Sequence, residues 1–298
     1  MTKFPRALQI LGVFIITIWV SFLAVSCKPV TSTSGDEVTS QTVYNRVLET
    51  GVIRAAYITY PPAAMKDTVS GEMSGIFVEA LEQAASNLGL KVEWTEEVGW
   101  GAQIEGLNSD RYDIVGSPVW ANPTRGKLTN MSRPLYYSGI GVYVKSGDPK
   151  FAGITPADWT PINSEGFRIA TIDGETADLI ARTQFPKAQR VSLTQLSDIS
   201  QKFLEVANGQ ADVLFAEPYF AQQYAKNNPD REFTNLALQK PIRVLGNCYM
   251  FKKNETQFKH MLDVAFEDLL NSGYIDELLA KYEGGDTFYK VANPYRAQ

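Results

Sequence analysis

The sequence predicts an α/β protein with two similar lobes, and three observations support this. Helical and strand patterns alternate along most of the chain, which is typical of α/β folds. The alternation runs twice, with a proline-containing stretch around Pro156 and Pro161 between the two runs. The length of 298 residues is too great for one small core and suits two modest domains. No internal sequence repeat is expected.

Each predicted element follows from local patterning. Thr42 is a suitable cap for a short helix that ends at Gly51. Tyr60-Pro61-Pro62 must end the strand before it, because proline fixes φ and lacks a donor. The expected strands are 52–57, 91–96, 113–116, 136–145, 168–172, 211–215 and 248–252. The expected helices are 75–88, 100–107, 176–183, 197–208, one after Pro218, 256–272 and 275–282.

The N-terminus is interpreted as an export signal. Lys3 and Arg6 precede an apolar run over 7–25, which ends in small residues and Cys27. This pattern predicts a lipoprotein signal peptide over 1–26, lipid attachment at Cys27 and a flexible tether over 27–41. The alternative is an uncleaved membrane anchor, since the apolar run nearly suffices to span a bilayer. Either interpretation places the rest of the chain outside the cytoplasm, in the cell envelope or periplasm.

Charge and composition exclude several function classes. The formal net charge is −5, and removal of the signal peptide with its two cations makes it more negative. Phosphate binding needs clustered Lys and Arg, so no nucleic-acid partner is expected. The chain has one histidine and two cysteines, Cys27 and Cys248. Neither a zinc site nor a disulfide framework is therefore expected.

Six segments occur in an order that carries a family resemblance. They are 51–54 with Tyr60-Pro61-Pro62, 75–79 leading to 88–89, 100–107, 112–115 leading to Thr124-Arg125, Gly174-Glu175-Thr176-Ala177 with 209–214, and the end at 265–275 and 281–282. In this order the chain resembles the bacterial extracellular solute-binding proteins of family 3, the polar amino-acid type, in their lipoprotein form. Members of this family are binding subunits of ABC importers.

The resemblance implies a two-lobed, type II periplasmic-binding-protein fold with a ligand cleft between lobes joined by two crossover strands. Lobe 1 is expected over 42–134 and 247–298, and lobe 2 over 140–243. A ligand that touches both lobes only when they are closed shifts the equilibrium toward closure. The implied protein is a monomer without cofactor or enzymatic activity. Its partners are a small carboxylate-bearing solute, an ABC permease and, through the lipid anchor, a membrane.

The resemblance also implies a set of ligand-binding residues. Arg125 takes the position of the arginine that pairs with the ligand carboxylate, since a guanidinium fits a carboxylate with two parallel hydrogen bonds. Tyr60 and Trp100 occupy positions where aromatic rings face the ligand side chain. Thr176 offers a hydroxyl and a helix-start amide to an anion. Glu217 stands where an aspartate usually binds the ligand ammonium.

Two departures qualify this set. A second acid is common in lobe 1, but here that position is Tyr57 or Ile58, depending on a one-residue shift of the alignment. A small Gly-x-Thr stretch is replaced by Pro118-Val119-Trp120, where proline has no amide donor. Tyr57 and Trp120 therefore join the candidate site as aromatic residues. We expect a ligand with a carboxylate and an apolar or planar body, and an ordinary polar amino acid fits less well.

Two alternative functions remain open at this point. Cyclohexadienyl dehydratases share the fold and place a buried glutamate at a position like Glu217 as general acid. The fold also serves as a ligand-sensing module for signalling receptors. The sequence does not identify the ligand, and it does not separate a permease partner from a receptor partner.

Overall fold

The computed structural model describes residues 41–155, 158, 160–238 and 240–283. The expected signal peptide, the lipidation site Cys27 and all of the expected tether except Gln41 lie outside these residues. Within the described ranges, no helix is both long enough and apolar enough to cross a bilayer.

The elements alternate between helix and strand as the sequence predicts. The helices are α1 (Val43–Thr50), α2 (Ile76–Asn87), α3 (Gln103–Asn108), α4 (Pro123–Leu128), α5 (Thr176–Gln184), α6 (Ile199–Ala207), α7 (Pro218–Asn227), α8 (Thr256–Asn271) and α9 (Tyr274–Glu283). The strands are β1 (Val52–Tyr57), β2 (Met65–Lys66), β3 (Met73–Ser74), β4 (Lys91–Glu97), β5 (Ile114–Trp120), β6 (Thr129–Met131), β7 (Tyr136–Lys145), β8 (Arg168–Ile172), β9 (Gln189–Leu193), β10 (Val213–Ala216), β11 (Phe233–Asn235) and β12 (Arg243–Lys252).

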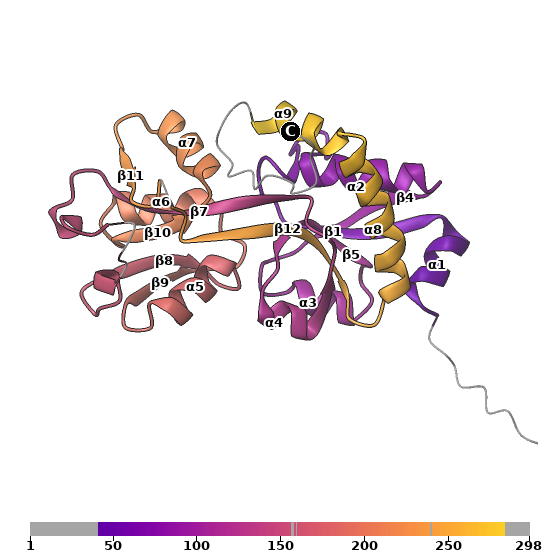
Figure 1. The fold of residues 1–298 in the computed structure, drawn as a ribbon, viewed down its shortest axis with the longest axis horizontal. Coiled ribbons are helices and arrows are strands. Elements are labelled where there is room, and N and C mark those ends of the chain that lie inside the picture. Colours follow the sequence, from indigo (N-terminus) through magenta and orange to yellow (C-terminus); the bar gives the residue numbers. More distant parts are fainter. Residues whose placement is uncertain (1–40, 156–157, 159, 239, 284–298) are drawn as a thin grey trace, which may run out of the picture. The chain divides into compact units, whose positions relative to one another are not determined.

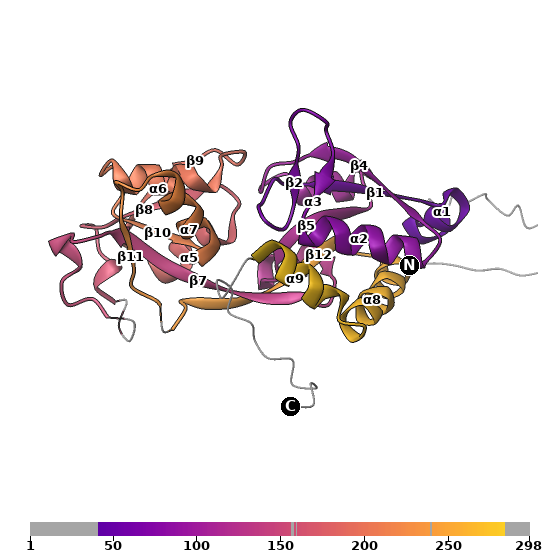
Figure 2. The same cartoon turned by 90° about the horizontal axis from the view of Figure 1, so that it is seen from above.

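We call the elements from α1 to β6, with α8 and α9, lobe 1. Its parallel strands lie in the order β4-β1-β5, and β12 adds antiparallel to β5. Helix α2 packs on β4 and β5, because its apolar residues recur on one face and are buried. Helices α8 and α9 lie beside α2 (Figure 2), so the end of the chain completes the lobe in which the described chain begins.

We call the elements from β8 to β11 lobe 2, and it repeats the arrangement of lobe 1. Strand β8 pairs in parallel with β9 and β10, as β1 pairs with β4 and β5. Strand β7 adds antiparallel to β10, as β12 adds to β5. Two successive β-α-β-α-β units therefore build the molecule, which confirms the two-lobed α/β fold.

Two long strands connect the lobes. Strands β7 and β12, each of ten residues, pair antiparallel with each other from Arg243↔Ile140 to Asn247↔Tyr136. Figure 1 shows them side by side between the two groups of elements. Each strand also pairs with the sheet of one lobe, so both crossover strands continue the backbone hydrogen bonding of the sheets.

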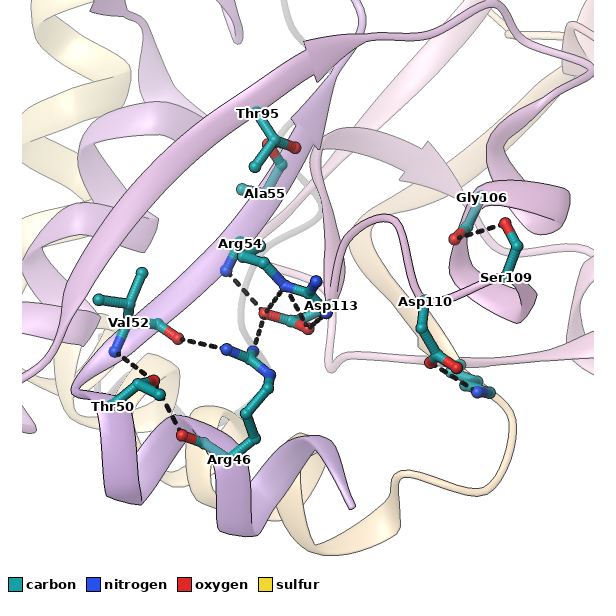
Figure 3. A network of polar contacts seen from close by, with 11 residues as sticks. Arg46, Thr50, Val52, Arg54, Ala55, Thr95, Gly106, Ser109, Asp110 and Asp113 are labelled. Atoms are coloured by element: carbon teal, nitrogen blue, oxygen red, sulfur yellow. Dashed lines mark hydrogen bonds and ion pairs between the residues drawn. The ribbon is translucent and has the colours of Figure 1, made fainter. Parts of the chain in front are cut away.

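An ion-pair cluster fixes the amino ends of the strands in lobe 1 (Figure 3). The Asp113 carboxylate, directly before β5, accepts hydrogen bonds from the Arg54 backbone N–H at 2.7 Å and from Arg54 Nη2 at 2.8 Å. Arg46 of α1 adds a further ion pair to the same carboxylate. The Asp113 side chain is fully buried, and removing one partner from such a cluster is strongly destabilising.

The structure corrects several expected boundaries. The helix expected over 100–107 begins only at Gln103, because residues 100–102 form a separate turn in which the Ala102 N–H donates to the Gly99 carbonyl oxygen. The strand expected over 113–116 extends to Trp120, and all seven of its residues are buried. Strand β9 is missed because its sequence QRVSL is largely exposed at a sheet edge and lacks an apolar run.

Candidate functional site

A small cavity lies where lobe 1 meets lobe 2. Its lining residues are Tyr60, Trp100, Pro118, Trp120, Arg125, Glu175 and Thr176. Its volume of about 10 Å³ is close to the space that one water needs. Five residues predicted from the sequence therefore meet around one point, although they lie on separate strands, loops and helix starts.

Arg125 is held in place by the start of α4. The Asn122 side chain caps this helix by accepting the Arg125 backbone N–H at 3.0 Å, and Pro123 begins it. The guanidinium then crosses to lobe 2. Arg125 Nη1 donates to Thr176 Oγ1 at 3.1 Å and to the Trp120 carbonyl at 3.0 Å, and Nη2 donates to the Gly174 carbonyl at 3.3 Å.

These acceptors of Arg125 are uncharged oxygens. Burial lowers the pKa of Arg125 to about 10, and the negative charge of Glu175 opposes this change. Arg125 is therefore still a cation at neutral pH. A buried cation whose hydrogen bonds go to neutral oxygens is costly without a counter-ion, so the cavity presents a site for an anion.

Aromatic rings surround Tyr60. Its ring centroid lies 5.5 Å from that of Trp100, 6.5 Å from that of Trp120 and 4.8 Å from that of Phe220, all in edge-on arrangements. Such pairs add stabilisation beyond the burial of their area. Phe220 belongs to α7 of lobe 2 and was not predicted. Phe220 lies in the first turn of the helix that begins at Pro218. Its sequence position could have indicated a cleft residue only if Glu217 was already known to face the cleft.

Glu217 meets lobe 1 through Tyr60. The Tyr60 hydroxyl donates to Glu217 Oε2 at 2.5 Å, and both side chains are buried. Burial raises the pKa of Glu217 to about 7, against hydrogen bonds from Ser138 and Tyr60 that lower it. Glu217 therefore changes its charge near neutral pH, which an exposed glutamate does not do.

A buried ion pair lies behind the start of α5. Lys202 Nζ lies 2.8 Å from both carboxylate oxygens of Glu175 and donates to the Phe215 carbonyl at 2.9 Å. Burial raises the pKa of Glu175, and the neighbouring lysine opposes that change. Sequence reasoning missed Lys202, because a lysine in an amphipathic helix is usually solvated.

Glycines permit the close approach of the two lobes. A Cβ atom at Gly174 would lie 2.6 Å from the Gly101 backbone nitrogen, and the φ of Gly174 is +82°. The Gln195 side chain of lobe 2 accepts the Gly101 N–H at 3.0 Å. A bulkier residue at Gly174 would push apart the backbones of the two lobes beside the cavity, whereas one at Gly101 would meet the Gln195 side chain.

Three sequence-predicted positions do not line the cavity, and Glu217, which bonds Tyr60, is one of them. Tyr57 is buried but does not line the cavity, because its ring packs edge-on against Trp94 at 6.3 Å and lies under Lys66 Nζ. Ile58, the alternative at that position, uses its backbone N–H to bond Ser117 Oγ at 2.7 Å. Cys27 lies outside the described residues.

Several known proteins have sequences similar to this chain. The L-cystine-binding protein TcyJ of Escherichia coli is 25% identical over 81% of this chain and 86% of its own length. A probable amino-acid ABC transporter-binding protein of Haemophilus influenzae is 38% identical, but the match spans 34% of that protein. The cyclohexadienyl dehydratase of Pseudomonas aeruginosa is 24% identical over 74% of this chain and 78% of its length.

Solved structures share the fold. The ancestral amino acid-binding protein AncCDT-1, described as a precursor of cyclohexadienyl dehydratase, superposes with a TM-score of 0.68 at 22% identity, covering 81% of this chain and 99% of its own. The substrate-binding protein AbpA of Streptococcus pneumoniae, bound to L-arginine, gives 0.66 at 20% identity, covering 80% and 96%.

A family profile decides the relationship. The sequence profile of the family described as bacterial extracellular solute-binding proteins, family 3, matches residues 52–285, which include every residue of the cavity and every element of the two lobes except α1. The chain belongs to the bacterial extracellular solute-binding proteins of family 3.

Proposed function

We propose that this chain is the substrate-binding subunit of an ABC importer and captures a small carboxylate-bearing solute, an amino acid or a related compound. The buried Arg125 guanidinium carries the proposal, because its hydrogen-bond acceptors in the described structure are all uncharged oxygens. A ligand carboxylate would supply the missing negative charge. Binding proteins for cystine and an amino-acid importer subunit bound to L-arginine are among its relatives.

The start of α5 supports the same anion site. Thr176 is the first residue of this helix, and its hydroxyl already contacts Arg125. The first N–H groups of a helix have no partner within it and carry partial positive charge. Glu175 also lines the cavity, and its ion pair with Lys202 offsets part of its negative charge. Arg125 and the helix start supply the positive potential that attracts an anion.

Entry of a solute requires the cleft to open. The cavity of about 10 Å³ cannot hold an amino acid while Tyr60, Trp100 and Trp120 stay where they are. We propose lobes at 42–134 with 247–298 and at 140–243, which separate by bending of β7 and β12. The bound ligand then takes the place of some of the contacts that Tyr60 and Arg125 of lobe 1 make with lobe 2. Closure over the ligand follows because contacts to both lobes form only in the closed state.

The place of action follows from the family and from the N-terminal sequence. Family members are extracellular or periplasmic solute-binding proteins. We propose that Cys27 carries the lipid, with Ser26-Cys27 as the cleavage point, and that residues 27–41 tether the lobes to the membrane beside the permease.

Titration of a ligand panel tests the anion site. The purified chain is screened by thermal shift and calorimetry against L-amino acids, L-cystine and simple carboxylates, since a ligand that binds only the folded state raises the melting temperature. We expect binding of at least one carboxylate and a loss of affinity of about 100-fold in Arg125→Met. Arg111→Met, at a half-exposed arginine of the same lobe paired with Glu96, is the matched control and should bind normally.

Two outcomes would contradict this proposal. If no member of the panel binds, the chain is not a receptor for small carboxylates. If serine binds tightly and binds Arg125→Met equally well, the anion site is not at Arg125, and the expectation of an apolar or planar ligand body is wrong as well.

A dehydratase-like activity is the second candidate, and one observation favours it. Glu217 is buried with a pKa of about 7, which suits a general acid at neutral pH. A cyclohexadienyl dehydratase is among the relatives. Appearance of aromatic product from prephenate or arogenate, followed by absorbance and lost in Glu217→Gln, would establish this activity. Absence of aromatic product from the wild type would exclude this activity for these two substrates.

A further inference from the structure

An acid, Glu175, lies beside the proposed anion site. Arg125 Nη2 donates to the Gly174 carbonyl at 3.3 Å, and Arg125 Nη1 donates to Thr176 Oγ1 at 3.1 Å. Glu175 stands between these two contacts in sequence and lines the same cavity. It is only 4% exposed, so solvent does little to screen its charge. An unrestrained carboxylate at this position would be a ready counter-ion for Arg125.

Lys202 of α6 binds this carboxylate instead. Lys202 Nζ lies 2.8 Å from both oxygens of Glu175 and donates to the Phe215 carbonyl oxygen at 2.9 Å. The Lys202 side chain is completely buried, and a buried ammonium group needs such partners to stay charged. In the described part of the chain, Lys202 is the cation within ion-pair distance of Glu175, whereas Arg125 keeps uncharged oxygens as its acceptors.

The same ion pair keeps the Glu175 side chain from capping α5. Glu175 occupies the N-cap position of this helix, but its side chain accepts no hydrogen bond from the first turn. A capping carboxylate would bond the first N–H groups and offset the positive end of the helix dipole. Because Lys202 holds the carboxylate, the side chain leaves these N–H groups to another anion. Both positive features of the site, Arg125 and the helix start, therefore depend on where the Glu175 carboxylate is held.

We propose that Lys202 is a positioning residue that holds Glu175 away from Arg125 and so keeps the anion site open for the carboxylate of a solute. The inference rests on the proposed function and adds to it a residue that does not itself line the cavity. Without Lys202, the buried carboxylate of Glu175 would lose its counter-ion and turn to Arg125. The protein's own acid would then occupy the place of the solute carboxylate.

The first test compares affinities by calorimetry, with L-amino acids, L-cystine, acetate and benzoate as probes. Lys202→Met should weaken the binding of whichever probe the wild type binds by at least about ten-fold, because Glu175 then competes for Arg125. Adding Glu175→Gln to Lys202→Met should restore affinity to within about two-fold of wild type, because neither buried charge remains. Glu175→Gln alone should bind no more weakly than wild type, since the acid is held away from the solute.

The variants contain their own control for the loss of Lys202. Lys202→Met and the double variant both lose the bond to the Phe215 carbonyl, so the comparison between them isolates the charge of Glu175. Lys150→Met removes a lysine of lobe 2 that pairs with Asp212 outside the cavity lining, and it should bind normally. A double variant as weak as Lys202→Met would overturn the inference. So would a loss of affinity in Glu175→Gln alone, because the acid would then contact the solute itself.

The second test needs no ligand and detects the competing contact itself. Urea unfolding of Arg125→Met, Glu175→Gln and the two combined gives the coupling between these side chains, first with Lys202 present and then in the Lys202→Met background. We expect this coupling to be at least about ten-fold larger, as a ratio of unfolding equilibrium constants, when Lys202 is absent. A purely structural role of Lys202 would leave the coupling unchanged, and that result overturns the inference.

Two further outcomes are separated by this design. If Lys202→Met does not fold, Lys202→Gln, which is also uncharged but keeps a donor group, takes its place in both tests. If the wild type binds none of the probes, the proposed function fails. The ligand-free coupling then still decides whether Lys202 keeps Glu175 from Arg125.

Discussion

The two lobes share one ion-pair arrangement at the amino ends of their strands but present opposite chemistry at the carboxyl ends. Asp113 in lobe 1 and Asp212 in lobe 2 each accept the backbone N–H and the guanidinium of an arginine on the first strand, Arg54 or Arg168. At the cleft, lobe 1 contributes Arg125 and aromatic rings, whereas lobe 2 contributes carboxyl groups. The scaffold is repeated, and the binding chemistry lies in the segments that follow the strands.

The ion-pair clusters of the two lobes differ in burial, and this difference predicts that removing their aspartates lowers the free energy of unfolding by unequal amounts. The Asp113 side chain is completely buried and has two arginine partners, whereas Asp212 is 9% exposed and its partners Arg168 and Lys150 are about one-third exposed. Asp113→Ala should lower the free energy of unfolding by about 3–5 kcal/mol, because two guanidinium groups lose their buried partner. Asp212→Ala should cost only about 1–2 kcal/mol, since solvent reaches its partners. Urea unfolding followed by circular dichroism measures both, and equal losses would show that burial does not set the difference.

Glu217 of lobe 2 titrates in a pH range where Arg125 of lobe 1 does not. Burial raises the pKa of Glu217 to about 7, from an ordinary value of 4.5. Between pH 4.5 and pH 7, Glu217 is ionised in the unfolded chain but still protonated in the folded protein. Its contribution therefore lowers the free energy of unfolding as the pH rises through this range. In Glu217→Gln the amide side chain has no ionisable group in this pH range. Relative to wild type, this variant should gain up to about 3 kcal/mol of unfolding free energy between pH 4 and pH 8.

Thermal unfolding across this pH range measures the gain. Glu232→Gln, at an exposed acid of the same lobe, is the control and should follow the wild type. A difference between Glu217→Gln and wild type that stays constant with pH would mean that Glu217 does not ionise in the folded protein near neutrality.

The sequence was sufficient to predict what depends on local pattern. Thr42 caps α1 through Asn45, and Gly51 ends it in the left-handed conformation, as expected. The α/β alternation could be predicted in the same way. The grouping of Tyr60, Trp100, Arg125 and Thr176 was implied by the family resemblance, and the structure places all four around one cavity.

Contacts between distant segments could not be predicted in the same way. Asn247 hydrogen-bonds Trp120, which lies 127 residues away in sequence, and Ser138, which lies 109 residues away. A buried Asn gives no local signal of its partners. Two similar lobes were predicted from the repeated alternation, but the matching ion pairs were not predicted, although a signal existed: Arg54 with Asp113 and Arg168 with Asp212 occupy equivalent strand positions. Two short motifs separated by different lengths do not produce a recognisable sequence repeat.

The smallest expected effect on stability tests how closely the lobes must meet. Gly174 and Gly209 both belong to lobe 2 and have positive φ, +82° and +71°, so alanine at either should cost about 1 kcal/mol. Only at Gly174 would the new Cβ meet lobe 1, 2.6 Å from the Gly101 nitrogen, whereas Gly209 faces open space. Gly174→Ala should therefore lose at least ten-fold in affinity for whichever panel amino acid the wild type binds, while Gly209→Ala binds normally. Calorimetric titration of both variants measures these affinities. Because the cost of the positive φ is matched, a loss of affinity confined to Gly174→Ala can be assigned to the clash and to incomplete closure. Equal affinities would mean that the lobes need not approach this closely.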